Sequence, residues 1–120
     1  MIWWPRYTGD WSRATIGLSL LEKGAYGELL DWCYTHEKPL PLDGATIWRI
    51  AGARTATETN ACDRVLKLHF ERTESGYVNA RCALEVARWR EKSEKSTKAI
   101  NLRWERERAR LAMVENGKKK

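Results

Sequence analysis

Residues 55–79 decide the fold of this chain, and they read TATETNACDRVLKLHFERTESGYVN. The stretch opens with Thr55 and Glu58, a pair whose hydroxyl and carboxylate satisfy free backbone donors at the start of a helix. Apolar residues then recur at the spacing of one helical face. The predicted inner face consists of Ala61 or Cys62, Val65, Leu66 and His69. We therefore expect a helix that begins at Thr55.

Directly after this helix, the sequence predicts a β-hairpin. Two short runs, residues 68–72 and 77–79, flank the turn-forming sequence Glu74-Ser75-Gly76. Short runs on either side of a Ser-Gly turn are typical of a two-stranded ribbon. The hairpin is followed from Arg81 onward by a segment rich in helix-forming residues, for which Cys82, Val86 and Trp89 are the predicted inner stripe.

Two more helices are predicted upstream. Ser19 and Glu22 form a second capping box, and a helix follows to about His36. Its predicted inner stripe is Leu18, Leu21, Ala25, Leu29 and Trp32. Pro39 and Pro41 end that helix and give an extended connection. A short helix then follows Asp43, which can cap it, with Ile47, Ile50 and Ala51 inside and Gly52 at its end.

Helix, short helix, helix, hairpin and helix is the element order of a winged helix-turn-helix. The predicted fold class is mainly α with a small β-hairpin (α+β), as a winged helix-turn-helix with a long basic C-terminal helical extension. We expect a winged-helix-like domain over residues 1–90 and a basic helical extension over residues 91–120. Residues 1–17 are expected to form an irregular or extended arm, packed onto the domain by Trp3, Trp4, Tyr7 and Trp11. The alternative for these aromatic rings is stacking on single-stranded bases.

The charge of the chain is concentrated near its C-terminus. The 120 residues carry a net charge of +6, but residues 1–80 hold 9 basic and 10 acidic residues, for −1. Residues 81–120 hold 13 basic and 6 acidic residues, for +7. A basic extension of this kind favours an anionic partner, with nucleic acid first and a membrane surface second.

Several other classes are excluded or disfavoured. No apolar run approaches the ~20 residues of a membrane span, and the N-terminal residues do not resemble a signal peptide. The three cysteines are widely spaced and there are two His, so we expect free thiols, no zinc site and a cytoplasmic location. No nucleophile, metal or phosphate-binding motif is present, so we expect neither an enzyme nor a cofactor.

Two surfaces are candidates for DNA binding. The first is the outer face of the third predicted helix, where Asn can read adenine and Arg can read guanine. It consists of Arg54, Thr57, Asn60, Arg64 and Lys67. The alternative is that these polar residues simply face water. Glu58 and Asp63 oppose phosphate contact here, and the hairpin tip, with Glu71, Arg72 and Glu74, is net negative.

The second surface is the basic extension, in which phosphate contacts would give salt-sensitive, sequence-independent affinity. Its residues are Arg88, Arg90, Lys92, Lys95, Lys98, Arg103 and Arg106, with Arg108 and Arg110 beyond them. The alternative is a solvated helix with ion pairs such as Glu91 with Lys95. An apolar stripe in the same segment, Ile100, Trp104, Leu111 and Val114, is expected to fold back on the core, pair with a second chain or dock on a host protein.

A family resemblance covers about residues 4–90. It rests on Trp4-Pro5-x-Tyr7-x-x-Asp10-Trp11, on Glu22-x-Gly24-Ala25-Tyr26-x-x-Leu29-Leu30-x-Trp32, on Pro39-Leu40-Pro41-x-Asp43 and Ile50-x-Gly52, on Val65-Leu66-x-x-Phe70, and on Tyr77-x-Asn79-x-Arg81-x-x-x-Glu85. These residues resemble the YdaU-type prophage proteins, domain-of-unknown-function family 1376. The block from Glu22 to Tyr26 is the most specific piece.

That family is similar to the winged-helix N-terminal domains of phage replication organisers. The resemblance implies DNA binding, duplex and possibly single-stranded, at a phage origin inside a bacterial host cell, with recruitment of host replication proteins. A second hypothesis is a phage protein-interaction module that binds and redirects or inhibits a host protein. The near-neutral first 80 residues favour this second hypothesis.

Overall fold

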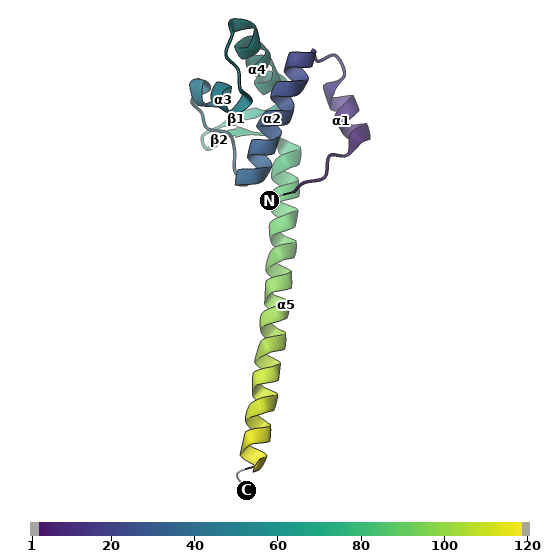
Figure 1. Cartoon of the computed structure of the whole chain (residues 1–120), viewed down its shortest axis with the longest axis vertical. Helices are drawn as coiled ribbons and strands as arrows, with labels where there is room; N and C mark the ends of the chain where they lie inside the picture. Colours follow the sequence, from purple (N-terminus) through teal and green to yellow (C-terminus); the bar gives the residue numbers. More distant parts are fainter. Residues whose placement is uncertain (1–2, 119–120) are drawn as a thin grey trace. The chain divides into compact units, whose positions relative to one another are not determined.

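The computed structural model describes residues 3–118, with side chains described to residue 114. The chain is mainly helical with a two-stranded antiparallel hairpin, so the predicted α+β class is confirmed (Figure 1). Its elements are α1 (Thr8–Thr15), α2 (Leu20–His36), α3 (Gly44–Ala51), α4 (Ala56–His69), β1 (Glu71–Thr73), β2 (Gly76–Val78) and α5 (Ala80–Lys118). The chain divides into a compact unit, Met1–Val86, and a tail unit, Ala87–Lys120.

Helix α2 is central to the compact unit. The predicted capping box at its start is confirmed, because Ser19 Oγ accepts from the Glu22 N–H (3.2 Å) and Glu22 Oε1 accepts from the Ser19 N–H (3.3 Å). Its buried face includes Leu29, which is completely buried. This face packs against α3 and α4, while α1 lies on the other side of α2 (Figure 1). The predicted inner position of Leu21 is wrong, since its side chain is exposed at the first turn of α2.

The core is formed by side chains of α2, α3, α4 and the first turns of α5, together with Leu40 and Phe70. Its fully or nearly fully buried apolar residues are Ala25, Tyr26, Leu29, Leu30, Cys33, Tyr34, Leu40, Ile47, Cys62, Val65, Leu66, Phe70, Cys82 and Val86. Cys62, Val65 and Leu66 of α4 and Ile47 of α3 are therefore in the core as predicted. The other predicted inner residues Ile50, Ala51 and His69 are only half-buried. Trp89, predicted to continue the inner stripe of α5, is instead exposed.

Helix α3 begins and ends where its sequence signals lie, and α4 begins where its signal lies. Thr55 and Glu58 form the predicted capping box of α4. Gly52 ends α3 in the left-handed conformation at φ 79°, where glycine is favoured. Asp43 is the residue that precedes α3, but its carboxylate accepts from the Thr46 hydroxyl (2.6 Å) rather than from the backbone.

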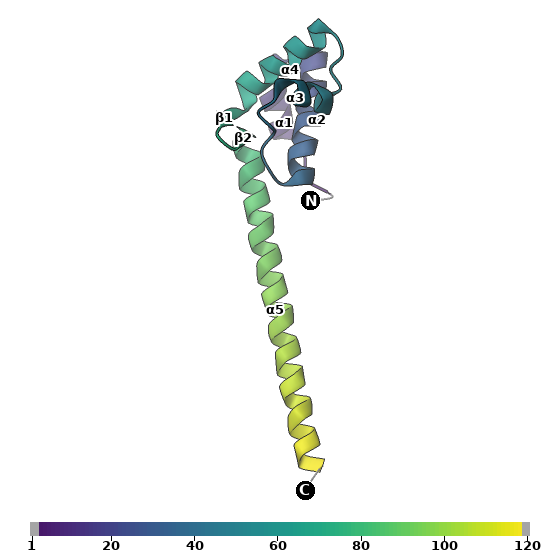
Figure 2. The same cartoon turned by 90° about the vertical axis from the view of Figure 1, so that its left-hand side faces the viewer.

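The hairpin begins three residues later than predicted. Leu68 and His69 belong to α4, and β1 and β2 form the hairpin between α4 and α5 (Figure 2). Glu71 pairs with Val78 and Thr73 with Gly76. These two residues are helical rather than extended because their neighbours are buried against α2. The buried neighbours are the α4 side chains before them and Phe70 after them. A third extended segment joins the hairpin at Leu40, whose backbone exchanges two 2.9 Å hydrogen bonds with Tyr77.

The N-terminal residues differ from the expected irregular arm, because Thr8–Thr15 form α1. The helix is favoured by Asp10 in its first turn and Arg13 in its last turn. Packing of the arm through Trp4 and Trp11 is confirmed: the Trp4 ring stacks on Tyr34 (4.2 Å between centroids) and Trp11 on Tyr26 (5.2 Å). Trp3 is 72% exposed and contributes no packing to the core. Tyr7 is also exposed, although the Arg81 guanidinium lies over its ring (4.8 Å to the centroid).

The stability of the compact unit is expected to depend on pH through His69. Its ring stacks on Tyr26 (4.5 Å), and burial lowers the pKa of His69 below its ordinary value. Protonation is therefore easier in the unfolded chain, so stability is present above the ordinary histidine pKa of about 6.5 and falls as the pH drops below it. We expect urea unfolding midpoints to decrease from pH 7.5 to pH 5, and the His69→Gln variant to lose part of this slope. An unchanged slope would contradict this assignment.

Candidate nucleic-acid interface

The outer face of α4 carries the first predicted DNA-binding surface. All five predicted residues are exposed; Arg54 precedes the helix, and Thr57, Asn60, Arg64 and Lys67 follow one another along it. Their spacing of three, four and three residues places the last four on one side of a helix. The structure therefore brings these side chains to a common surface.

One of these residues, Arg64, makes an ion pair within the compact unit that the sequence did not predict. Arg64 Nε lies 3.0 Å from Glu22 Oε2, and the side chain of Glu22 is 11% exposed. This carboxylate belongs to the α2 capping box, so the same residue both caps α2 and holds α4 against it. Beside it, Asp63 Oδ1 accepts from Trp48 Nε1 (2.9 Å), which joins α4 to α3. The α4 surface is therefore held in place by contacts to both neighbouring helices.

The tail unit carries the second predicted surface. Because α5 is one continuous helix, its basic residues have defined positions around it. Six of them are spaced by four, three, eight, three and four residues. Because an α-helix has 3.6 residues per turn, these spacings place all six side chains on one side of α5. We call this line the basic ridge, and it consists of Arg88, Lys92, Lys95, Arg103, Arg106 and Arg110. At 1.5 Å per residue, it extends over about 33 Å of helix.

The structure does not bring the whole predicted tail set together. Arg90 and Lys98 lie away from the ridge, as does Arg108, which is on the same line as Arg90. Two ridge side chains also make local ion pairs, Lys95 with Glu91 (3.0 Å) and Arg110 with Glu107 (2.5 Å). All residues from 87 to 114 are exposed, so every ridge side chain is accessible.

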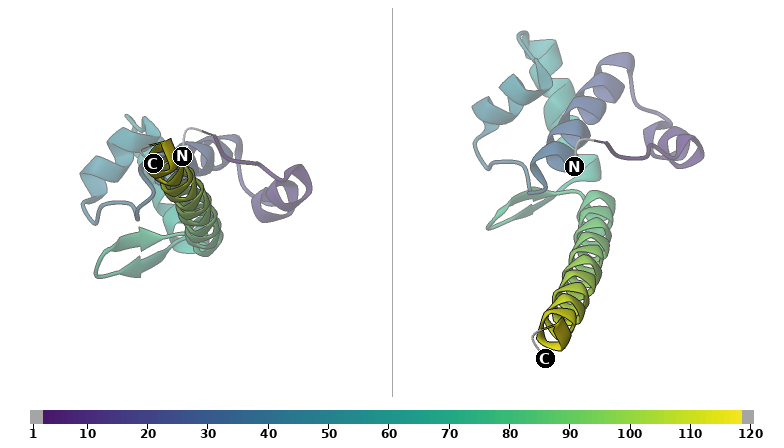
Figure 3. Two further views of the ribbon diagram at one scale, coloured as in Figure 1. Left: turned by 90° about the horizontal axis from the view of Figure 1, so that it is seen from below. Right: turned by 60° about the horizontal axis from the view of Figure 1, so that its bottom comes forward.

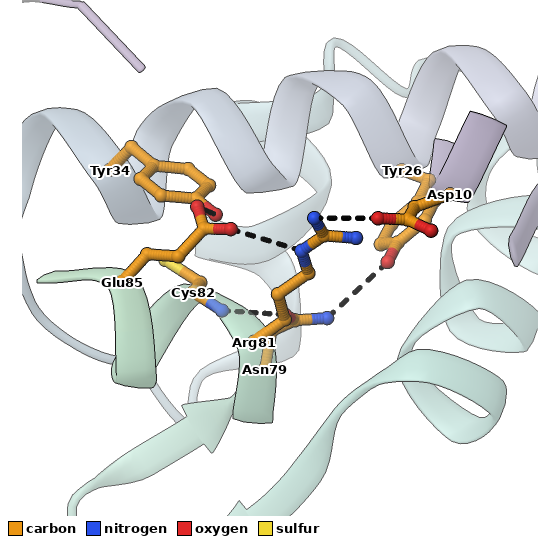
Figure 4. A network of polar contacts seen from close by, with 7 residues as sticks. All are labelled: Asp10, Tyr26, Tyr34, Asn79, Arg81, Cys82 and Glu85. Atoms are coloured by element: carbon orange, nitrogen blue, oxygen red, sulfur yellow. Dashed lines mark hydrogen bonds and ion pairs between the residues drawn. The ribbon is translucent and has the colours of Figure 1, made fainter. Parts of the chain in front are cut away.

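A polar network fixes the first turns of α5 within the compact unit (Figure 4). Asn79 is buried, and its Oδ1 accepts from the Cys82 N–H (3.0 Å) while its Nδ2 donates to the His69 carbonyl (2.9 Å). Arg81 pairs with Asp10 of α1 (2.9 Å) and with Glu85 (3.0 Å). Burial and the bond to Glu85 raise the pKa of Tyr34, so this hydroxyl is a donor at neutral pH.

The sequence predicted inner positions for His69 and Cys82, but it assigned no structural or functional role to the polar side chains of Asn79, Arg81 and Glu85. One signal was available for Asn79, because Asn is a strong helix N-cap residue and here it stands directly before a run of helix formers. Its second role, as a donor to the carbonyl at the end of α4, depends on how the chain folds back through the hairpin (Figure 3).

The aromatic rings of the N-terminal segment are engaged within the chain. Trp4 stacks on Tyr34 and donates to Asp31 (2.9 Å), while the Arg6 guanidinium lies over the ring of Trp11 (4.1 Å). The Trp11 ring also stacks on the ring of Tyr26. These interactions favour the packing role of Trp4 and Trp11 over base stacking.

Neither a metal centre nor a membrane span is found in the described part of the chain. Among the side chains described, those of residues 3–114, no three His, Cys, Asp or Glu groups gather in a way that could hold a metal ion. No helix within residues 3–118 has the length and apolar character that crossing a membrane requires.

The fold and its two surfaces define a class: a small helical domain with a hairpin, continued by a basic helix. A family model described as "Protein of unknown function (DUF1376)" matches residues 2–87. The chain therefore belongs to this family. The matched residues correspond closely to the compact unit, which ends at Val86. Comparison with curated proteins and with solved structures gave no match.

Proposed function

We propose that this chain is a prophage-type DNA-binding protein of the bacterial cytoplasm that acts in replication initiation and has no enzymatic activity of its own. The observation that carries the proposal is the basic ridge, an accessible line of six cationic side chains on one continuous helix. Phosphate neutralisation by such side chains supplies most of the sequence-independent affinity of DNA-binding proteins.

The arrangement of the compact unit supports a winged helix-turn-helix. Helices α3 and α4 are followed directly by the β1–β2 hairpin, and Leu40, between α2 and α3, adds a third extended segment to it. In this class the second helix of the pair enters the major groove. Helix α4 would then present Asn60 and Lys67 to base edges, while the hairpin, with Glu71 and Glu74 exposed, stays off the phosphates.

Duplex DNA is the favoured ligand over single strands. Single-strand binding without sequence preference relies on aromatic platforms on which bases stack. In this chain Trp4 and Trp11 stack on other side chains of the compact unit.

Titration of the full chain with duplex DNA at ~50 and ~200 mM salt tests the proposal. Six phosphate contacts predict a loss of affinity of about 10³-fold between these salt concentrations. The ridge variant Arg88→Gln, Lys92→Gln, Arg106→Gln should reduce the slope of log K against log salt by about 2.7, at about 0.9 per phosphate contact.

A matched control removes the same charge from other faces of the same helix. The variant Arg90→Gln, Lys98→Gln, Arg108→Gln also lowers the net charge by three, and we expect a much smaller change in slope. Equal effects of the two variants would show that net charge matters and the ridge does not. No duplex binding at ~50 mM salt would reject the DNA proposal.

Base reading by α4 needs variants that leave its packing intact. Arg64 holds the buried Glu22, so its removal would change stability as well as contacts. Asn60→Ala and Lys67→Ala avoid this problem, because both side chains are exposed. If α4 reads bases, Asn60→Ala relaxes sequence preference, whereas ridge variants weaken all sequences alike.

The second candidate function is a protein-interaction module that binds a host protein. It is favoured by the near-neutral charge of residues 1–80 and by the apolar side chains of Ile16 and Leu20, which are 82% and 87% exposed. Exposed apolar side chains of this kind can contribute to a binding site for another protein.

A further inference from the structure

The compact unit has a groove of mixed polar and apolar lining that the proposed DNA contacts do not use. It encloses about 230 Å³ between the first turns of α2 and the connection from α3 to α4. Its floor consists of small residues, Gly24, Ala25, Ala51, Gly52 and Ala53, and Leu20 and Leu21 are exposed at its side. The volume is smaller than the roughly 300–1,000 Å³ of a small-molecule pocket, so it suits a single large side chain.

The charged residues among the described groove lining are acidic. Glu28 and Glu58 contribute to its wall, and no Lys or Arg is among the residues that line it. Glu58 is held in position because its carboxylate accepts from the Arg54 and Thr55 N–H groups (both 3.1 Å). The groove therefore suits an occupant that combines a bulky apolar group with positive charge.

The tail unit carries a segment with this chemistry. Ile100, Trp104, Leu111 and Val114 lie on one line of α5, and we call them the tail seam. All four are exposed, with Trp104 at 60%. Arginines flank the seam on both sides, Arg103 and Arg110 on one and Arg108 on the other.

Pairing of two tail seams with each other is a weaker alternative. The line of the seam also contains Ser93, Ser96 and Glu107, which interrupt the apolar repeat that a coiled coil needs. In a parallel pair, Arg103 of one helix would face Arg108 of the other, five residues further on, and like charges at these flanking positions oppose pairing. Charge complementarity therefore favours the acidic groove over a second tail as the partner of the seam.

We propose that the tail seam of one copy of this chain docks in the groove of a second copy, with the Trp104 indole over the small-residue floor. Arg103 or Arg108 then lies near Glu28 and Glu58, where opposite charges fix the orientation. The contact joins two different surfaces, so copies assemble head to tail or by reciprocal exchange of tails. The proposal does not depend on DNA binding, and its test contains no DNA.

Sedimentation velocity of the full chain, at tens of micromolar in low salt, is the test. We expect the unmodified chain to form dimers or larger species. Leu20→Lys places a positive charge at the groove, and Trp104→Glu removes the indole from the seam. Both residues are exposed, so neither variant should disturb folding. Each variant alone should weaken self-association about 30-fold or more, as expected for a central contact residue.

Mixing the two variants separates this proposal from its alternatives. The Leu20→Lys chain keeps an intact tail and the Trp104→Glu chain keeps an intact groove, so the mixture should restore a dimer of one copy of each. Matched controls are Leu68→Lys on α4 and Leu102→Glu on another face of α5, both exposed and both expected to self-associate normally.

Three results would overturn the proposal. A monomeric unmodified chain means that the seam does not bind a second copy. Normal self-association of Leu20→Lys, with loss only in Trp104→Glu, means that the tails pair with each other. A mixture that stays monomeric excludes groove and seam as partners even if each variant is impaired.

Discussion

Replacing Gly76 with alanine should lower the free energy of unfolding by about 2–4 kcal/mol, because two costs add at this residue. Gly76 has φ 134°, a region that side chains with a Cβ rarely adopt. A Cβ built there would lie 2.0 Å from the Leu40 carbonyl oxygen, which is backbone and is held by Tyr77. The hairpin or the Leu40 segment must move to admit one methyl group.

Urea denaturation followed by circular dichroism measures this effect, and the chain offers a matched control. Gly24 lies inside α2 with nothing within 4 Å of a built Cβ. Gly24→Ala should therefore stabilise the chain by up to about 1 kcal/mol, since alanine is the better helix former. The same chemical change is expected to have opposite signs at the two positions. A Gly76→Ala chain as stable as the unmodified one would contradict the close approach to Leu40.

The second large effect is expected at Asn79. Asn79→Ala should lower the free energy of unfolding by about 2–4 kcal/mol, because the residue combines a helix cap with a buried bond to another element. The alanine variant loses the acceptor for the Cys82 N–H and leaves the His69 carbonyl without its amide donor. An amide-to-hydroxyl contact with Tyr26 is also lost (3.4 Å).

A graded series separates the two contributions of Asn79. Asn79→Ser retains a capping oxygen but cannot reach the His69 carbonyl as the amide does, so roughly half of the loss should remain. Asn101→Ala is the control on the exposed surface of α5, and its effect should stay within about 0.5 kcal/mol. Equal stability of Asn79→Ala and Asn101→Ala would mean that the Asn79 contacts drawn in Figure 4 contribute nothing to folding.

The local signals of the sequence were sufficient wherever a helix end depends on its own residues. Both capping boxes formed as predicted at Ser19 and Thr55, and Gly52 ends α3. The sequence-based predictions were wrong where contacts with residues distant in the sequence determine the local structure. Leu68 and His69 joined α4 rather than a strand, and the N-terminal segment became α1, with Asp10 paired to Arg81 from the far end of the unit.

The candidate interface shows the same division. The positions of Thr57, Asn60, Arg64 and Lys67 on one face follow from helical spacing alone. The contact of Arg64 with Glu22 could not be predicted, since 42 residues separate them in the sequence and the pair exists because α2 packs on α4. In the tail, the sequence supplied the charges, but only a helix without a break aligns six of them in a ridge.

By itself, the sequence determined the order of the elements from α2 to α5, part of the core and the positive charge of the C-terminal segment, because these depend on periodicity, capping chemistry and composition. Only the tertiary structure decided which polar residues are shared between elements: Glu22 between a cap and Arg64, Asn79 between α4 and α5, and Gly76 against Leu40. The physical reason is that such contacts join atoms far apart in the chain. No local pattern records their proximity, and folding alone creates it.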